Sequence, residues 1–186
     1  ADSQGAAVIT GSFLSSIDFG GTPLTAQSGD VYLAKLDASG NEVWSHAYGD
    51  AAPLQEGKTV AVGADDGIVL GGAYRGTIDF GGNPFTNPNT GQTLFVARFD
   101  ASGNHLWSAS HGDDQPQSRI EVAVDANDNL LIGGGFRGTI DFGSGPLIGT
   151  GSSDDVFVAK LGPGGEALWS LRGGDAFDQF VSAIAT

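Results

Sequence analysis

Aspartate is the residue best placed to do chemistry in this sequence, because it recurs at fixed intervals within one short motif. The motif, Ile-Asp-Phe-Gly followed by Gly or Ser, places carboxylates at Asp18, Asp79 and Asp141, with spacings of 61 and 62 residues. Carboxylates gathered on one rim could bind a cation. An aspartate followed by small residues is also an ordinary turn device, since its oxygens accept backbone N–H groups. Both interpretations are open at the level of sequence.

Positive charge is scarce and regularly placed. Five of the eight Lys and Arg residues occupy equivalent repeat positions: Lys35, Arg98 and Lys160 on one expected strand, and Arg75 and Arg137 after another. Because a buried charge is costly without a partner, such regular placement implies one. We expect each of the first three to form a structural ion pair with a motif aspartate, Arg98 with Asp79 for example.

One segment begins like a calcium-binding loop. Asp125, Asn127 and Asn129 follow the alternating oxygen-donor pattern of such a loop. The pattern then fails, because Leu130 stands where the loop needs glycine and Phe136 where it needs glutamate. A hairpin turn is the preferred interpretation. No cofactor is expected, and calcium is the alternative.

Nothing in the sequence is typical of a catalytic centre. His46, His105 and His111 hold three different repeat positions, so they predict neither a ring nor a pair. The absence of cysteine excludes a thiol nucleophile, disulfides and thiolate metal sites. The glycine runs at 71–72 and 133–135 are expected to permit close sheet packing rather than to bind phosphate. We therefore assign no catalytic, cofactor-binding or metal-binding residue and expect no enzymatic activity.

The three tryptophans share one repeat position. Trp44, Trp107 and Trp169 are each preceded by an aliphatic residue and followed by serine. We expect them to pack between neighbouring sheets, because large aromatic side chains fill such a space well. A sugar-stacking platform is the alternative.

A repeat of about 62 residues must position all of these side chains. Besides the motif and the tryptophans, a third block recurs in register, at 30–36, 93–99 and 155–161. Within one repeat, apolar runs bounded by turn residues predict four strands, at 58–64, 68–75, 93–100 and 105–111. A four-stranded antiparallel sheet is the blade of a β-propeller, so the expected fold class is an all-β propeller.

The whole chain, 1–186, is expected to be one unit of three blades. Two blades lie near 57–112 and 117–172, and the third combines 6–48 with a C-terminal strand within 178–186. Three blades are fewer than the four to eight of typical propellers, so one chain should not close alone. We expect a homo-oligomer in which the C-terminal strand of one copy completes the first blade of the next. A dimer with six blades is preferred over a trimer with nine, on the usual size range. A piece of a longer propeller is the rival explanation.

Composition excludes several classes of partner. Acidic residues number 22 against 8 basic ones, a formal net charge of −14. Such a chain lacks the positive field that nucleic acid or anionic lipid requires. No apolar run approaches the roughly 20 residues that span a bilayer. Nucleic-acid binding and membrane insertion are therefore not expected.

The repeats resemble those of a known family. The series Gly-Ser-Phe, Ile-Asp-Phe-Gly-Gly, Asp-Val-Tyr-Leu-Ala-Lys-Leu and Val-Trp-Ser, from Gly11 to Ser45, is similar to the bacterial seven-bladed propeller repeats catalogued as SBBP, and the other two copies match as well. The resemblance implies a propeller fold and a secreted or cell-surface bacterial protein. It supplies no catalytic residue.

The function expected from these observations is a non-enzymatic, self-assembling propeller scaffold or binding module. The alternative is a secreted or surface-displayed propeller that binds a glycan or a protein in the manner of a lectin. A fragment of a propeller hydrolase or lyase is the third possibility.

Overall fold

The computed structural model describes residues 1–52 and 54–186. In this part of the chain there are 17 β-strands and no helix, and all strand pairs are antiparallel. None of the described residues therefore forms a helix long and apolar enough to cross a membrane. The all-β fold class is confirmed.

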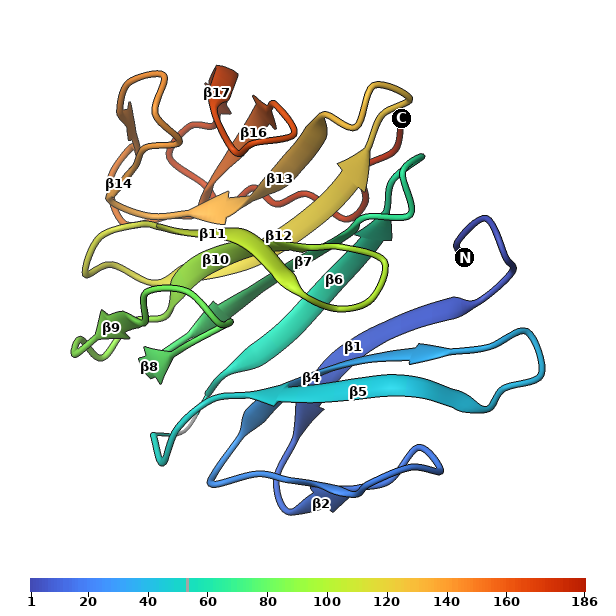
Figure 1. Cartoon of the computed structure of the whole chain (residues 1–186). Helices are drawn as coiled ribbons and strands as arrows, with labels where there is room; N and C mark the ends of the chain where they lie inside the picture. Colours follow the sequence, from blue (N-terminus) through green and yellow to red (C-terminus); the bar gives the residue numbers. More distant parts are fainter. Residues whose placement is uncertain (53) are drawn as a thin grey trace.

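Three sheets follow one another along the chain (Figure 1). The N-terminal sheet has the order β1-β4-β5, with β1 Ala7–Phe13, β4 Asp30–Leu36 and β5 Glu42–Tyr48. The central sheet has the order β6-β7-β10-β11, with β6 Glu56–Val62, β7 Ile68–Tyr74, β10 Thr93–Phe99 and β11 His105–His111. The C-terminal sheet has the order β12-β13-β16-β17, with β12 Gln117–Val124, β13 Leu130–Phe136, β16 Asp155–Leu161 and β17 Ala167–Gly173.

A small hairpin forms part of one connection in each sheet. It lies between the second and third strands of the central and C-terminal sheets, and between β1 and β4 in the N-terminal sheet. The three hairpins pair β2 Ser16–Ile17 with β3 Leu24–Thr25, β8 Gly76–Ile78 with β9 Phe85–Asn87, and β14 Thr139–Ile140 with β15 Leu147–Ile148. The sequence predicts the central one, in 76–92, only as a loop. The strands β8 and β9 have only three residues each, too few to give a recognisable strand pattern among the Gly and Pro residues of this segment.

The sheets pack face to face, which explains why the central strands β7 and β10 are mostly apolar. Side chains alternate across a strand, so β7 directs Leu70 into a core shared with the N-terminal sheet and Val69 into a core shared with the C-terminal sheet. On β10, Phe95 and Val96 divide in the same way. All seven residues of β7 and of β10 are buried, including the polar Thr93 and the charged Arg98 of β10.

The glycine runs permit close backbone approach, as predicted. A Cβ on Gly72 would collide with the Glu56 carbonyl oxygen and the Phe95 ring. Gly134 meets the equivalent pair, the Arg119 carbonyl and the Phe157 ring. Any larger residue would push these two strands and the aromatic ring apart.

One expectation about the end of the chain is not met in a single copy. The C-terminal strand expected within 178–186 has no strand assignment, and the N-terminal sheet has three strands among the described residues. Completion of this sheet is expected from the C-terminal strand of another copy, so it stays a prediction. A strand requires a neighbour with which to exchange backbone hydrogen bonds. In the single chain the segment lies against the C-terminal sheet, at the opposite end of the molecule from β1 (Figure 1).

Candidate functional site

The bases on the third strand pair with aspartates, but not with the motif aspartates. Lys35 Nζ lies 2.8 Å from Asp2 Oδ2, and Lys160 Nζ lies 2.7 Å from Asp125 Oδ2. Both aspartates begin the turn between the first two strand positions of a sheet. The expectation of pairs with Asp18, Asp79 and Asp141 is therefore wrong.

Arg98 departs from the other two bases in a way that has a simple cause. The equivalent turn position in the central sheet is Gly63, which has no side chain. Arg98 instead reaches Asp65, two residues further on, at 2.9 Å, and also donates to the carbonyl oxygens of Asp128 and Pro163. The buried guanidinium thus joins the central sheet to turns of the C-terminal sheet.

The motif aspartates act as turn devices, which was the second interpretation. Asp18, Asp79 and Asp141 each accept a hydrogen bond from the backbone N–H two residues later, at 2.7 to 2.8 Å. A carboxylate used in this way fixes the turn at the end of β2, β8 or β14.

The calcium-like segment is a hairpin turn, as preferred. Asp125 Oδ1 accepts hydrogen bonds from the backbone of Asn127 and Asn129, while Oδ2 faces Lys160. The Lys160 ammonium and these turn hydrogen bonds hold the pKa of Asp125 well below its ordinary value. The described residues contain no group of three or more acidic or histidine side chains arranged to hold a metal ion.

Two tryptophans pack between sheets and the third is exposed. A Cβ on Gly103, in the outer turn of the central sheet, would lie 3.1 Å from the Trp44 ring. The Trp107 ring covers Gly165 in the same way, and its Nε1 donates to the Pro163 carbonyl at 2.8 Å. Among the described residues no further sheet follows the one that carries Trp169, which is 39% exposed.

The histidines are not brought together into a site. His46 stacks on Trp44 with ring centroids 5.2 Å apart, and His105 Nε2 lies 3.0 Å from Ser108 Oγ. His111 contacts Phe142, and one of its ring nitrogens lies 2.9 Å from the Asp141 carbonyl oxygen. Burial lowers the pKa of His111.

The most unusual feature is the free edge of β1. Residues 2–6 form a turn in which Asp2 N donates to the Ala6 carbonyl at 3.0 Å and Gly5 N donates to the Asp2 carbonyl at 3.1 Å. The same pair of bonds closes the β6–β7 and β12–β13 hairpins. Here the turn precedes β1, but no described strand lies on the other side of it. The N-terminal sheet therefore has a hairpin turn with only one of its two strands.

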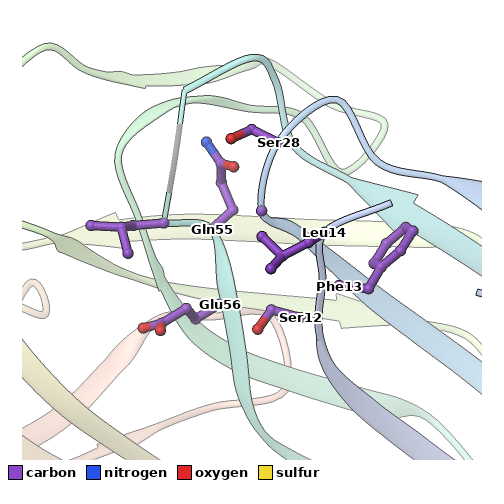
Figure 2. A pocket seen from close by; sticks show the side chains of 8 residues that line it. Ser12, Phe13, Leu14, Ser28, Gln55 and Glu56 are labelled. Atoms are coloured by element: carbon purple, nitrogen blue, oxygen red, sulfur yellow. The ribbon is translucent and has the colours of Figure 1, made fainter. Parts of the chain in front are cut away.

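A cavity of about 290 Å³ lies at the far end of this edge. The end of β1, at Ser12, Phe13 and Leu14, lines one side, and Gln55 and Glu56 at the start of β6 line another (Figure 2). In the central sheet, the equivalent place beside the end of β7 holds the first strand of that sheet, β6. The cavity thus marks where a fourth strand would begin.

An Asp-Gln pair attaches the first strand of the central sheet, β6, to the second strand, β7. This pair was not predicted from the sequence. Gln55 Nε2 donates to Asp50 Oδ1 at 2.9 Å and to the Arg75 carbonyl at 2.6 Å. Asp50 Oδ2 accepts a hydrogen bond from Thr77 N at 2.7 Å. These two residues of the loop before β6 therefore bind the backbone just after β7.

The C-terminal sheet repeats this Asp-Gln pair. Gln117 Nε2 donates to Asp113 Oδ1 at 3.3 Å and to the Arg137 carbonyl at 3.2 Å, while Asp113 Oδ2 accepts from Thr139 N at 2.7 Å. The signal in the sequence is a glutamine every 62 residues with an aspartate four or five residues before it. It is inconspicuous because it falls in the loop before the first strand of each sheet or at the start of that strand, and the spacing between the two residues varies.

Comparison with known proteins supports the repeat fold without placing the chain in a family. No family model matches it, so the resemblance to SBBP repeats stays a prediction. An uncharacterized WD repeat-containing protein, L264 of Acanthamoeba polyphaga mimivirus, is 28% identical over 155 residues, which is 77% of this chain and 11% of that protein. The regulatory protein FlaEY of Caulobacter vibrioides is 27% identical over 172 residues, 90% of this chain and 18% of that protein. The chain thus spans less than a fifth of either relative.

Proposed function

We propose that this chain is a non-enzymatic β-propeller scaffold of three blades, which closes a ring by exchanging a strand between copies. In this ring, residues 178–186 of one copy form the missing first strand beside β1 of the next. The observation that carries the proposal is the free edge of β1, together with a segment at the other end that has the position of a first strand but no partner.

The position of that segment follows from two equivalent glycines. A Cβ on Gly71 of the central sheet would contact Ile120 and Val122 on β12, the first strand of the following sheet. A Cβ on Gly133, the equivalent residue of the C-terminal sheet, would contact Val181 and Ile184. The segment therefore lies where the first strand of a fourth sheet would lie.

Pairing would remove two unfavourable features at once. A free strand edge leaves backbone N–H and C=O groups unpaired. Phe177 and Phe180, in the C-terminal segment, are exposed, and strand exchange would bring this segment against the N-terminal sheet. The similarity to a WD repeat-containing protein agrees with the proposal, since WD repeats are propeller blades. Two copies would make six blades, within the usual size range.

Native mass spectrometry of the 186-residue chain tests this function. We expect a dimer whose abundance rises with protein concentration, because strand exchange is bimolecular. Ile184→Asp should give a monomer, since it places a charge where the segment packs on Gly133. The matched control is Ile148→Asp, at a residue on the β14–β15 hairpin that is 66% exposed; it should leave the mass unchanged. A trimer would replace the six-bladed ring by a nine-bladed one, and a monomer at all concentrations would overturn ring closure.

A binding module is the second candidate, favoured by the exposed Trp169 and Leu171 on β17. In this candidate the protein is secreted or displayed on a bacterial surface, as the resemblance to SBBP repeats implies, and Trp169 stacks on a sugar or a protein side chain. A glycan array that binds the wild type and not Trp169→Ala would support it. The ring proposal expects no such binding, because there Trp169 is covered by the next copy.

A further inference from the structure

The Asp-Gln pair occurs a third time, in the C-terminal segment. Asp175 Oδ1 accepts hydrogen bonds from Phe177 N at 3.0 Å and from Gln179 Nε2 at 2.7 Å. Gln179 N donates to the Asp154 carbonyl at 2.7 Å, as Gln55 N does to the Gly29 carbonyl at 3.0 Å. The internal geometry of the pair is therefore already formed.

The C-terminal pair lacks only the backbone that the other two pairs bind. In the central sheet that backbone is the Arg75 carbonyl and the Thr77 N–H, just after the second strand of the same sheet. Among the described residues, no strand of the same chain stands in this relation to Asp175 and Gln179. The Asp175 and Gln179 pair is therefore a preformed site for the backbone that follows the second strand of a sheet. A single copy has no such backbone beside this pair among its described residues.

The register of the sheets identifies the equivalent backbone at the other end of the chain. Phe13 is opposite Asp30 in the N-terminal sheet, as Tyr74 is opposite Thr93 in the central sheet. The residue after Phe13 is Leu14, which corresponds to Arg75. Ser16, which opens the β2–β3 hairpin, corresponds to Thr77, which lies in the β8–β9 hairpin.

We infer that Asp175 and Gln179 of one copy bind the Leu14–Ser16 backbone of a second copy of this chain. Gln179 Nε2 donates to the Leu14 carbonyl, and Asp175 Oδ2 accepts from Ser16 N–H. This inference rests on the proposed ring closure and names the contacts that fix its register. It agrees with the exposure of Leu14, at 82%, and of Phe177, at 76%, since both lie at the contact.

The tryptophan positions support the same junction independently. Inside the chain, Trp44 covers Gly103 and Trp107 covers Gly165. Gly40, the equivalent glycine of the N-terminal sheet, has nothing within 4 Å of the Cβ position, and Trp169 has no following sheet. Gly40 and Trp169 thus each lack the partner that their equivalents have inside the chain. In the proposed dimer, Trp169 of one copy covers Gly40 of the other and repeats the internal junction between sheets.

Gln179→Glu tests the inference, with Gln117→Glu as the matched control. The first replaces the amide donor with a carboxylate that repels both Asp175 and the Leu14 carbonyl. Losing a buried hydrogen bond in this way should raise the dimer dissociation constant, measured by sedimentation equilibrium, by about tenfold or more. Gln117→Glu makes the same change at an internal pair, so it should lower the melting temperature and leave the dissociation constant as in the wild type.

Hydrogen exchange at the Ser16 amide gives a second readout. Assembly of the wild type should slow this exchange, and Asp175→Ala should abolish the slowing while the strands of the three sheets stay protected. If the wild type assembles but Gln179→Glu binds equally well and Ser16 exchanges as fast as in the monomer, the inference is overturned and ring closure stands. If the wild type never assembles, ring closure itself has failed.

Discussion

At the scale of single residues, each tryptophan depends on a glycine contributed by the next sheet. Trp107 has such a partner in Gly165, together with a hydrogen bond to the Pro163 carbonyl, while Trp169 has neither within one chain. The same residue type at the same repeat position therefore has two different environments. Trp44 and Trp107 are partly buried and Trp169 is exposed, so the burial of a tryptophan depends on whether a further sheet lies beside it and not on the local sequence.

Replacing these tryptophans should show that difference in stability. Trp107→Ala should lower the free energy of unfolding by about 3 kcal/mol or more, because it opens a cavity between two sheets. Trp169→Ala, the matched change at the exposed position, should cost far less when measured on monomer at high dilution. Urea denaturation followed by circular dichroism measures both. Equal losses would mean that Trp169 is also buried in the single chain.

His111 should make stability depend on pH near neutrality. Burial lowers the pKa of His111 in the folded state, while in the unfolded state it returns to about 6.5. Below that pH the unfolded chain binds a proton that the folded chain does not, so stability is lost as the pH falls through this window. The pKa values of Asp2 and Asp125 are also lowered in the folded state, but these carboxylates stabilise it in their ionised form. Their contributions to stability are therefore lost only in more acidic solution.

The variant His111→Tyr isolates this effect, since Tyr48 occupies the equivalent position in the N-terminal sheet. Melting temperatures measured from about pH 7 to about pH 5.5 should fall for the wild type and change less for the variant, because the histidine of the unfolded chain takes up its proton in this range. An identical fall in both proteins would assign the pH dependence to other groups.

At the scale of strands, the sequence was sufficient for the long strands that have their neighbours in the chain, whereas the short strands β8 and β9 were predicted only as a loop. The strands predicted at 68–75 and 93–100 correspond to Ile68–Tyr74 and Thr93–Phe99. The C-terminal strand expected within 178–186 is not formed in the single chain, although its apolar pattern resembles that of β12, because strand formation also requires a partner edge. The ion pairs were assigned to the wrong aspartates because the turn that supplies them is distant in sequence from the bases.

Glycines in adjacent positions of β13 allow a direct test of the sheet packing. Gly134→Ala should destabilise the protein by about 1 to 3 kcal/mol, because the new methyl group meets the Arg119 carbonyl and the Phe157 ring. Gly133→Ala places a methyl group 3.4 to 3.5 Å from Val181 and Ile184, which is ordinary contact, and should be nearly neutral. Thermal unfolding of the two variants compares them directly, and a larger loss for Gly133→Ala would contradict this packing.

At the scale of the whole molecule, the proposed ring closure joins three separate features at the two ends of the chain. It pairs the β1 edge with the C-terminal segment, Gly40 with Trp169, and the Leu14–Ser16 backbone with the Asp175 and Gln179 pair. The repeat phase alone leads to the first of these pairings as an expectation, which stays a prediction. It does not lead to the other two, because they become visible only when internal junctions are compared atom by atom.

Net charge should govern how strongly copies associate. Each copy carries a formal charge of −14, so two copies repel one another, whereas the proposed junction consists of backbone hydrogen bonds, the Gln179 amide, the Asp175 carboxylate and apolar side chains, with no ion pair. Added salt screens the repulsion, with a Debye length near 10 Å at about 0.1 M, and has little effect on those short contacts. The dimer dissociation constant measured by sedimentation should therefore fall as sodium chloride is raised. Dissociation of the dimer by salt would mean instead that ion pairs between copies hold the junction, and would contradict the contacts inferred for Asp175 and Gln179.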